Sequence, residues 1–226
     1  MEIKGLKNIK DFGYLIMFDL ASRISGVCVW DIRLQKPHSI HKIVVDKEKA
    51  ELPVAELYNK IDLLFLELSK EIDLSKVFVS KEAMPTQVHG GNSTIQTFLA
   101  LAKSHAILDY YTFTHNIPVY DYTGVYPIST HAYLKKLLEK DKDYKIQKTD
   151  IRDYVCNKYD LQVGTLDESD AVFLAQTLIE FKWNKDLDEL IRERKRHRKT
   201  LKLSSAIKKV DEEITKLENL RLTINS

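Results

Sequence analysis

The stretch Tyr14-Leu-Ile-Met-Phe-Asp19, followed by Leu20-Ala-Ser-Arg-Ile-Ser-Gly26 and Val27-Cys-Val-Trp-Asp31, decides the fold. An apolar run ends in one aspartate, a short polar turn follows, and a second apolar run begins after Gly26. This pattern predicts a hairpin of two buried strands, over about 14–19 and 25–31. Taken alone, Asp19 is most simply an ordinary strand-end aspartate. A rigid strand that ends in a carboxylate also suits a metal ligand or a catalytic acid.

The rest of the chain alternates between strand and helix patterns. Apolar runs predict further strands over 39–45, 77–82 and 118–122, and helical spacing predicts helices over 53–72, 93–115, 129–139, 149–158 and 166–181. Three consecutive strands joined by short connections favour an antiparallel meander. The order predicts an α/β fold, with a mixed five-stranded sheet flanked by helices.

Composition sets the class of protein. The chain has 226 residues, is 44% hydrophobic and can therefore bury a substantial core. It has no apolar run of the roughly 18 residues that a membrane span needs, and Met1 to Phe12 lack the apolar segment of a signal peptide. Cys28 and Cys156 do not have the spacing of metal ligands. We expect a cytoplasmic protein with reduced thiols and no membrane partner.

A basic tail follows a soft boundary near residue 183, which divides the chain into a body, 1–182, and a tail, 183–226. The tail has 12 Lys and Arg against 8 Asp and Glu, a pattern found in nucleic-acid-binding proteins and also on solvated helices. Six of the eight residues over 192–199 are basic. The tail is predicted to be a helical hairpin or a coiled-coil helix that pairs with another chain. The apolar seam behind this prediction consists of Leu203, Ile207, Val210, Ile214, Leu217 and Ile224.

Four carboxylates are predicted to lie at the ends of strands or near the beginning of a helix. Asp19 ends the first strand and Glu82 ends the fourth, while Asp167 and Asp170 lie three residues apart on one helix face. Neighbouring strands and a helix packed over their ends would bring all four together. Such a cluster needs cations, and hard oxygen ligands select Mg²⁺ or Mn²⁺. Two such ions per site suit the attack of water on a phosphodiester.

With these residues the sequence resembles the RuvC-like Holliday junction resolvases of the RNase H superfamily, over about residues 14 to 181. The resemblance rests on Asp19-Leu-Ala-Ser22-Arg-Ile-Ser25-Gly26, on Val79-Ser-Lys-Glu82 and on Asp167-Glu-Ser-Asp170-Ala171. The short form with a basic tail is most similar to the versions carried by bacteriophages. The resemblance implies an RNase H-like fold and a homodimeric, Mg²⁺-dependent endonuclease of DNA recombination and repair, which cuts four-way junctions symmetrically. It also implies that the four carboxylates are the catalytic metal ligands.

Contacts to DNA and between subunits are expected outside these motifs. The resemblance places Lys135 or Lys136 near the scissile phosphate, although a solvated helix lysine explains either one equally well. In the tail, Arg194, Arg196 and Arg198 are candidates for contacts to DNA phosphates. The helix over 93–115 and the tail are candidates for the dimer contact.

The sequence departs from the family at two places. Leu20-Ala21 follows the first aspartate, where the family often has Pro-Gly. Met84-Pro85 stands where bacterial members place an aromatic residue against unstacked bases, so strict sequence preference is in doubt. The loop His89-Gly-Gly-Asn92 is either a flexible DNA contact or a helix-capping turn, and His131 is interpreted as an ordinary surface or core histidine.

Three other interpretations compete with a junction resolvase. An RNase H-type nuclease that acts on flaps or RNA–DNA hybrids would use the same carboxylates. A non-catalytic junction-binding protein is disfavoured by the complete carboxylate set. Half of a sugar-kinase or actin-like ATPase would also begin with a strand that ends in aspartate, but it needs a second phosphate-binding hairpin that this sequence lacks.

Overall fold

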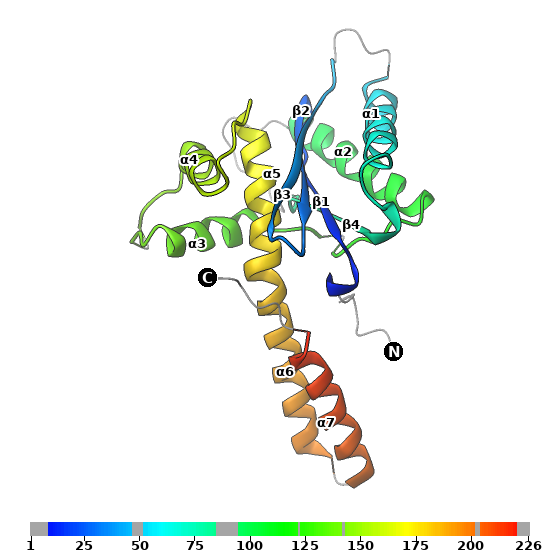
Figure 1. Ribbon diagram of the computed structural model, residues 1–226, viewed down its shortest axis with the longest axis vertical. Coiled ribbons are helices and arrows are strands. Elements are labelled where there is room, and N and C mark those ends of the chain that lie inside the picture. The colour runs from blue at the N-terminus through cyan, green and yellow to red at the C-terminus, as the bar shows by residue number, and fades with distance from the viewer. Residues whose placement is uncertain are drawn as a thin grey trace. The chain divides into compact units, whose positions relative to one another are not determined.

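The computed structural model describes residues 9–46, 52–84, 95–121, 123–141, 143–201 and 204–220 (Figure 1). The chain divides into two compact units, one that ends at Gln176 and one that begins at Thr177. Within the described ranges, no helix combines the length and the apolar character needed to cross a bilayer. The predicted site residues of the body belong to the first unit, and the basic run belongs to the second.

The first unit is built on a mixed sheet of four strands in the order β3-β2-β1-β4. Strand β1 (Tyr14–Asp19) pairs antiparallel with β2 (Ile24–Asp31), which pairs antiparallel with β3 (Lys36–Val44). Strand β4 (Val77–Lys81) pairs parallel with β1 on its other side. The predicted meander and the mixed α/β sheet are therefore confirmed.

Helices cover both faces of this sheet. Figure 1 shows α1 (Pro53–Leu68) and α2 (Ile95–Thr114) on one side of it and α5 (Leu166–Gln176) on the other. Beyond α5 lie α3 (Pro127–Leu137) and α4 (Lys148–Tyr159). The central strands are consequently buried on both faces, which explains why they are continuous apolar runs in the sequence.

Strand β1 divides its side chains between these two layers. Ile16 and Phe18 belong to the apolar core that includes side chains of α1 and α2. Because successive side chains alternate between the faces of a strand, Leu15, Met17 and Asp19 point to the face that α5 covers. All five side chains are buried. The alternation thus aims Asp19 at the helix that carries the other predicted aspartates.

The fifth strand predicted over 118–122 does not form in the described part of the chain. Instead, Val119 and Val125 each make an isolated parallel bridge, to Val79 and Glu82 respectively. A turn between the two bridges interrupts the pairing, because Asp121 Oδ1 accepts a hydrogen bond from the Thr123 N–H at 2.8 Å. The segment still covers the outer edge of β4, but as two short contacts rather than as a strand.

The second unit is helical. It begins with a π-helical segment, η3 (Thr177–Lys182), and continues as α6 (Trp183–Thr200) and α7 (Ser204–Glu218). Helices α6 and α7 pack against each other as a hairpin. Of the two forms predicted for the tail, the structure has the hairpin. Its buried apolar residues are Trp183, Leu187, Ile191, Val210, Ile214 and Leu217, whereas Leu203 and Ile224 of the predicted seam lie outside the described residues.

Candidate metal centre

Asp19 and Glu82 lie side by side at the ends of two parallel strands. The Glu82 N–H donates to the Phe18 carbonyl at 2.9 Å, which extends the pairing of β1 and β4 by one residue. Lys81 points to the face of the sheet that α2 covers, where it pairs with Asp109. Glu82 is the next residue, so it points to the opposite face, as Asp19 does. Burial, followed by the negative charges of Glu82 and Asp170, raises the pKa of Asp19 well above its usual value. Burial likewise raises the pKa of Glu82, although a hydrogen bond from Asp19 opposes this.

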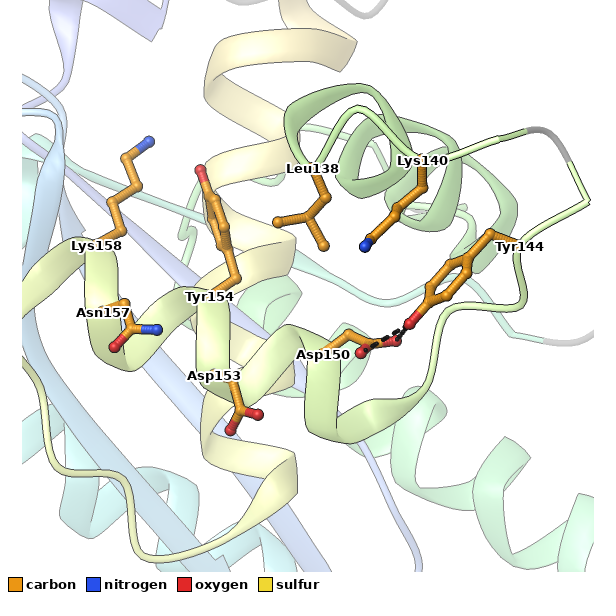
Figure 2. Close-up of a pocket in the computed structure, with 8 residues that line it drawn as sticks. All are labelled: Leu138, Lys140, Tyr144, Asp150, Asp153, Tyr154, Asn157 and Lys158. Atoms are coloured by element: carbon orange, nitrogen blue, oxygen red, sulfur yellow. Dashed lines mark hydrogen bonds between the residues drawn. The ribbon is translucent and has the colours of Figure 1, made fainter.

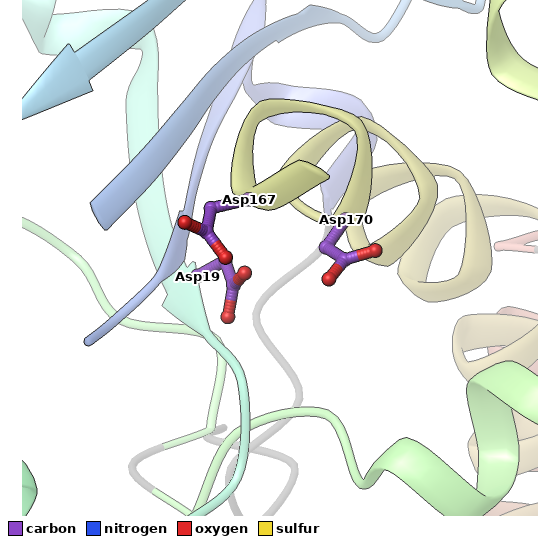
Figure 3. Close-up of side chains that lie close together, drawn as sticks. All are labelled: Asp19, Asp167 and Asp170. Carbon is purple, nitrogen blue, oxygen red and sulfur yellow. The ribbon is translucent and has the colours of Figure 1, made fainter. Parts of the chain in front are cut away.

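The first two turns of α5 bring two more carboxylates to this point. One oxygen from each of Asp19, Asp167 and Asp170 lies within 4.8 Å of the others (Figure 3). Glu82 is not part of this closest set, and it is linked to the set through Asp19. The structure thus brings together the four carboxylates that sequence reasoning selected, with three of them in one cluster.

Local contacts fix where α5 begins. Thr165 Oγ1 accepts a hydrogen bond from the Glu168 N–H at 3.3 Å and donates one to Glu168 Oε2 at 3.0 Å. This arrangement satisfies a free N–H of the first turn and turns the Glu168 carboxylate away from the cluster. Asp167 and Asp170 then share the face that packs over the sheet.

Gly26 makes this close packing possible. It pairs with Asp19 across β1 and β2, directly beneath the beginning of α5. A Cβ added at Gly26 would lie 2.0 Å from the Asp167 carbonyl oxygen. Only glycine therefore lets the backbone of the helix approach the strand so closely. The sequence indicated a turn at this position, and the structure shows a contact with the helix.

Lys148 is a member of the site that sequence reasoning missed. It is the first residue of α4, and its Nζ lies 2.8 Å from Asp170 Oδ2 and 3.3 Å from Asp167 Oδ1. Burial alone would lower the pKa of Lys148, but the hydrogen bond to Asp170 and the surrounding carboxylates raise it. Nothing in the local sequence distinguishes Lys148 from Lys140 or Lys145 nearby. Thr149, at which the predicted helix begins, is the second residue of the observed helix, and Gln147 is its N-cap.

One buried oxygen in the cluster lacks a partner. Burial raises the pKa of Asp170, against the effect of its hydrogen bond from Lys148. Asp170 Oδ1 is buried and accepts no hydrogen bond within the described part of the chain. Buried polar atoms nearly always have a partner. Asp170 Oδ1 is therefore available to bind a cation, in addition to the Lys148 ammonium that contacts Asp170 Oδ2. Four carboxylates around it form an oxygen-only donor set, which suits Mg²⁺ or Mn²⁺.

The other predicted site residues lie in two different places. Lys135 and Lys136 are in the last turn of α3, and Lys135 is one helical turn beyond His131. Burial lowers the pKa of His131, while the charge of Asp170 raises it, so this part of α3 lies within electrostatic reach of the cluster. Arg194, Arg196 and Arg198 are in α6 of the second unit. Pro85 and the loop over 89–92 lie outside the described residues.

A pocket of about 530 Å³ between α3 and α4 offers a contrast with the cluster. Figure 2 shows its two aspartates, and protein groups satisfy both of them. Asp150 accepts hydrogen bonds from the Tyr144 hydroxyl at 3.2 Å and from the Gln147 N–H at 2.8 Å, and Asp153 pairs with Arg152 at 3.0 Å. These carboxylates have structural partners, whereas the buried Asp170 Oδ1 has none among the residues that the structure describes.

Comparison with known proteins identifies the fold. No protein-family model matches the sequence, and no curated protein matches it. Two solved structures of RuvC from Thermus thermophilus, one of them in complex with Holliday junction substrate, each have a TM-score of 0.50 and 12% identity to this chain. The similarity covers 73% of this chain and 91% or 92% of the RuvC chains. The predicted RuvC-like fold is therefore confirmed, while the bacteriophage type stays a prediction.

Proposed function

We propose that the chain is a metal-dependent endodeoxyribonuclease that resolves four-way DNA junctions. The observation that carries this proposal is the cluster of Asp19, Asp167 and Asp170, with Glu82 beside it, on a RuvC-like fold. The four residues come from two strand ends and one helix, so a rigid scaffold holds them. The T. thermophilus RuvC complex with Holliday junction substrate supports branched DNA as the substrate class.

The carboxylates would hold Mg²⁺, with Mn²⁺ as a substitute, and two ions are expected per site. Bound ions of this kind supply an activated water and stabilise the leaving oxygen of a phosphodiester. Asp19 is the central residue of the cluster, and it shares a hydrogen bond with Glu82. Because burial raises the pKa values of these two groups, protons and metal ions compete for the same oxygens.

Lys148 has a different role in this proposal. In the metal-free protein it neutralises part of the charge of Asp167 and Asp170. Its side chain is 56% exposed, so the ammonium can also reach solvent and a phosphate beside the cluster. Together with Lys135 and Lys136, it would help to hold the DNA strand that is cut.

We also propose that the protein is a homodimer, because symmetric cleavage of a junction requires two active sites. The two subunits would pair through α2. The outer side of α2 carries Ile95, Leu99, Tyr110 and Phe113, which are all exposed and fall on one stripe at helical spacing. Phe113 is 74% exposed, which is unusual for a side chain of this size. We expect Phe113→Asp to shift the protein to monomers in light scattering. Ile128→Asp, at an exposed position of α3, serves as the control.

The central experiment measures cleavage and binding of a labelled four-way junction. We expect Asp19→Asn and Glu82→Gln to abolish cleavage in Mg²⁺ while they leave binding in Ca²⁺ or EDTA intact. Asp153→Asn makes the same chemical change outside the cluster and should cleave normally. Cleavage at the wild-type rate by either cluster variant would contradict the proposal.

A comparison of substrates separates the remaining alternatives. A junction resolvase should cut a four-way junction in preference to a flap or an RNA–DNA hybrid. Preference for a flap or a hybrid would instead identify another RNase H-type nuclease with the same centre. Binding without cleavage in either Mg²⁺ or Mn²⁺ would identify a non-catalytic junction-binding protein. Cytoplasmic location and a role in recombination and repair follow only if the junction is the substrate.

A further inference from the structure

The basic run of α6 is divided between two faces of the helix. One face turns toward α7 and carries the buried Leu187 and Ile191. At 100° per residue, Arg194 and Arg198 lie on that same side, and Lys195 lies at its border. We call Arg194, Lys195 and Arg198 the inner cations of the hairpin.

The inner cations are paired with acidic residues of α7. Arg194 Nε lies 3.4 Å from Glu213 Oε2, and Lys195 Nζ lies 3.0 Å from Glu218 Oε1. Arg198 donates to both oxygens of Asp211, with Nη2 3.1 Å from Oδ2. Two of the three arginines predicted to bind DNA, Arg194 and Arg198, therefore have partners within the hairpin.

The remaining cations form a row on the opposite face. Arg192, Arg196 and Lys199 follow one another at spacings of four and three residues, which aligns them along the helix. All three are exposed. Arg192 Nε donates to the Asp188 carbonyl within its own helix at 3.2 Å. Arg196 and Lys199 have no ion-pair partner in the described ranges. We call these three residues the outer row.

We propose that the outer row binds the sugar-phosphate backbone of duplex DNA, as a contact that does not involve the metal centre. Seven residues of helix span about 10 Å, and one DNA strand has a phosphate every 3.4 Å or so along the axis. Three cations on a rigid helix thus extend over about three phosphate-to-phosphate intervals of one strand. Arginine side chains also match phosphate geometry with paired N–H donors.

The hairpin favours DNA over a membrane surface as the partner. A helix that binds in a membrane interface needs an exposed apolar face beside its cations. Here the apolar side chains that the structure describes in both helices are buried or half-buried, and Leu187 of α6 and Ile214 of α7 are among the buried ones. The exposed side of α6 at the outer row is polar, so contact with a lipid surface would have no apolar component.

The test compares two triple variants of the full chain. The first changes the outer row by Arg192→Gln, Arg196→Gln and Lys199→Gln. The second removes the same charge from exposed lysines at the other end of the sheet from the metal centre, by Lys36→Gln, Lys70→Gln and Lys76→Gln. Binding of duplex and junction DNA is measured in EDTA over a range of salt concentrations. Circular dichroism and thermal melting check that both variants keep the wild-type fold.

We expect the outer-row variant to bind at least tenfold more weakly at low salt and to lower the slope of log K against log salt by about 2–3. The control variant should keep the wild-type slope. An unchanged slope in the outer-row variant would overturn the inference. The inference would also be overturned if the outer-row variant bound DNA as the wild type does but no longer bound anionic lipid vesicles.

This inference rests on the proposed function only for the choice of DNA as the partner, and the two can fail separately. If the wild-type protein cuts a junction but the outer-row variant binds normally, the nuclease proposal stands and the outer-row contact is wrong. If the salt slope falls but the wild-type protein cuts no junction in Mg²⁺ or Mn²⁺, the outer-row contact stands without the nuclease activity.

Discussion

At the scale of single residues, the spacing of the carboxylates depends most directly on Gly26. A Cβ there would lie 2.0 Å from the Asp167 carbonyl oxygen and 2.9 Å from the Glu168 nitrogen. Both atoms are backbone at the beginning of α5, so the helix would have to move. A misplacement of about 1 Å lowers catalytic rates roughly 100-fold. We expect Gly26→Ala to lower junction cleavage by about this factor and the free energy of unfolding by about 1–3 kcal/mol, as measured by cleavage rates and urea denaturation.

A second glycine provides the control for this prediction. A Cβ added at Gly13 would lie 3.6 Å from the Lys76 Cβ, which is an ordinary van der Waals contact. Gly13→Ala should therefore keep both the cleavage rate and the stability of the wild-type protein. Wild-type cleavage by Gly26→Ala would show that α5 can shift without disturbing the cluster.

Lys148 is predicted to compete with metal ions for the same oxygens. Its ammonium lies 2.8 Å from Asp170 Oδ2 and 3.3 Å from Asp167 Oδ1, two atoms that an ion would need. We expect Lys148→Met to tighten Ca²⁺ binding severalfold in calorimetry at pH 8, because the competing cation is gone. The same variant should cleave junctions more slowly, because the phosphate loses a nearby positive charge. Lys145→Met, three residues earlier, should change neither property. Unchanged Ca²⁺ affinity in Lys148→Met would contradict the competition.

At the scale of elements, β4 is held from both of its faces. Lys81 points into the α2 layer, where its buried ammonium pairs with Asp109, while the next residue, Glu82, points to the metal centre. A change in the packing of α2 against β4 should therefore reach Glu82. The two contacts are one residue apart on the same strand end.

This arrangement predicts the effect of breaking the pair of Lys81 and Asp109. The Lys81 side chain is 3% exposed and that of Asp109 is 37% exposed. Asp109→Ala leaves a buried charge without a partner, and solvent around the exposed partner moderates the cost, so we expect a loss of about 1–3 kcal/mol in the free energy of unfolding. Combining it with Lys81→Met should restore most of this loss in urea denaturation. A double variant no more stable than Asp109→Ala would indicate that packing, not charge, dominates.

The strands and helices of the body could be predicted where one physical signal dominated. Strand β1 is buried on both faces and is an apolar run up to its terminal Asp19, and β4 begins with the apolar Val77-Phe-Val79. The segment around Val119 and Val125 also contains residues that favour strands, but Asp121 and Gly124 interrupt them. It fails to form a strand because the turn at Asp121 interrupts the pairing. That turn is local, because Asp121 Oδ1 accepts a hydrogen bond from the Thr123 N–H two residues later. The predicted strand over 118–122 therefore extended across a turn that the sequence itself encodes, and the fifth strand is not confirmed.

At the scale of the whole molecule, the candidate site could be predicted only in part from the sequence. The usable signals were the type of a residue and its position at the end of a helix or strand. The four carboxylates could be found because each stands at a strand end or near the beginning of a helix. Lys148 could not, because a lysine on a polar helix has no distinctive pattern until the fold brings it to Asp170. The same holds for Arg194 and Arg198, whose partners on α7 emerge only when the hairpin closes.

The stability of the whole molecule should depend jointly on pH and metal. Burial raises the pKa values of Asp19, Glu82 and Asp170, and neighbouring carboxylates add to the effect. A carboxyl with a raised pKa in the folded state keeps a proton that the unfolded chain has released. Its contribution to stability is therefore complete below about pH 4 and is lost as the pH rises through the raised value. These groups should destabilise the metal-free protein at neutral pH, where bound Mg²⁺ would compensate them.

Thermal melting of the wild-type protein and Asp19→Asn, in EDTA and in Mg²⁺ from pH 5 to 8, tests this dependence. Each unit by which the pKa of Asp19 is raised corresponds to about 1.4 kcal/mol, or roughly 3–6 °C in Tm for a chain of this size. We expect Asp19→Asn to melt higher than the wild type in EDTA at pH 8, by an amount that shrinks toward pH 5. The variant should also lose most of the stabilisation by Mg²⁺, whereas Asp153→Asn should behave as the wild type. Equal stabilisation of Asp19→Asn and the wild type by Mg²⁺ would show that the ion binds somewhere other than this cluster.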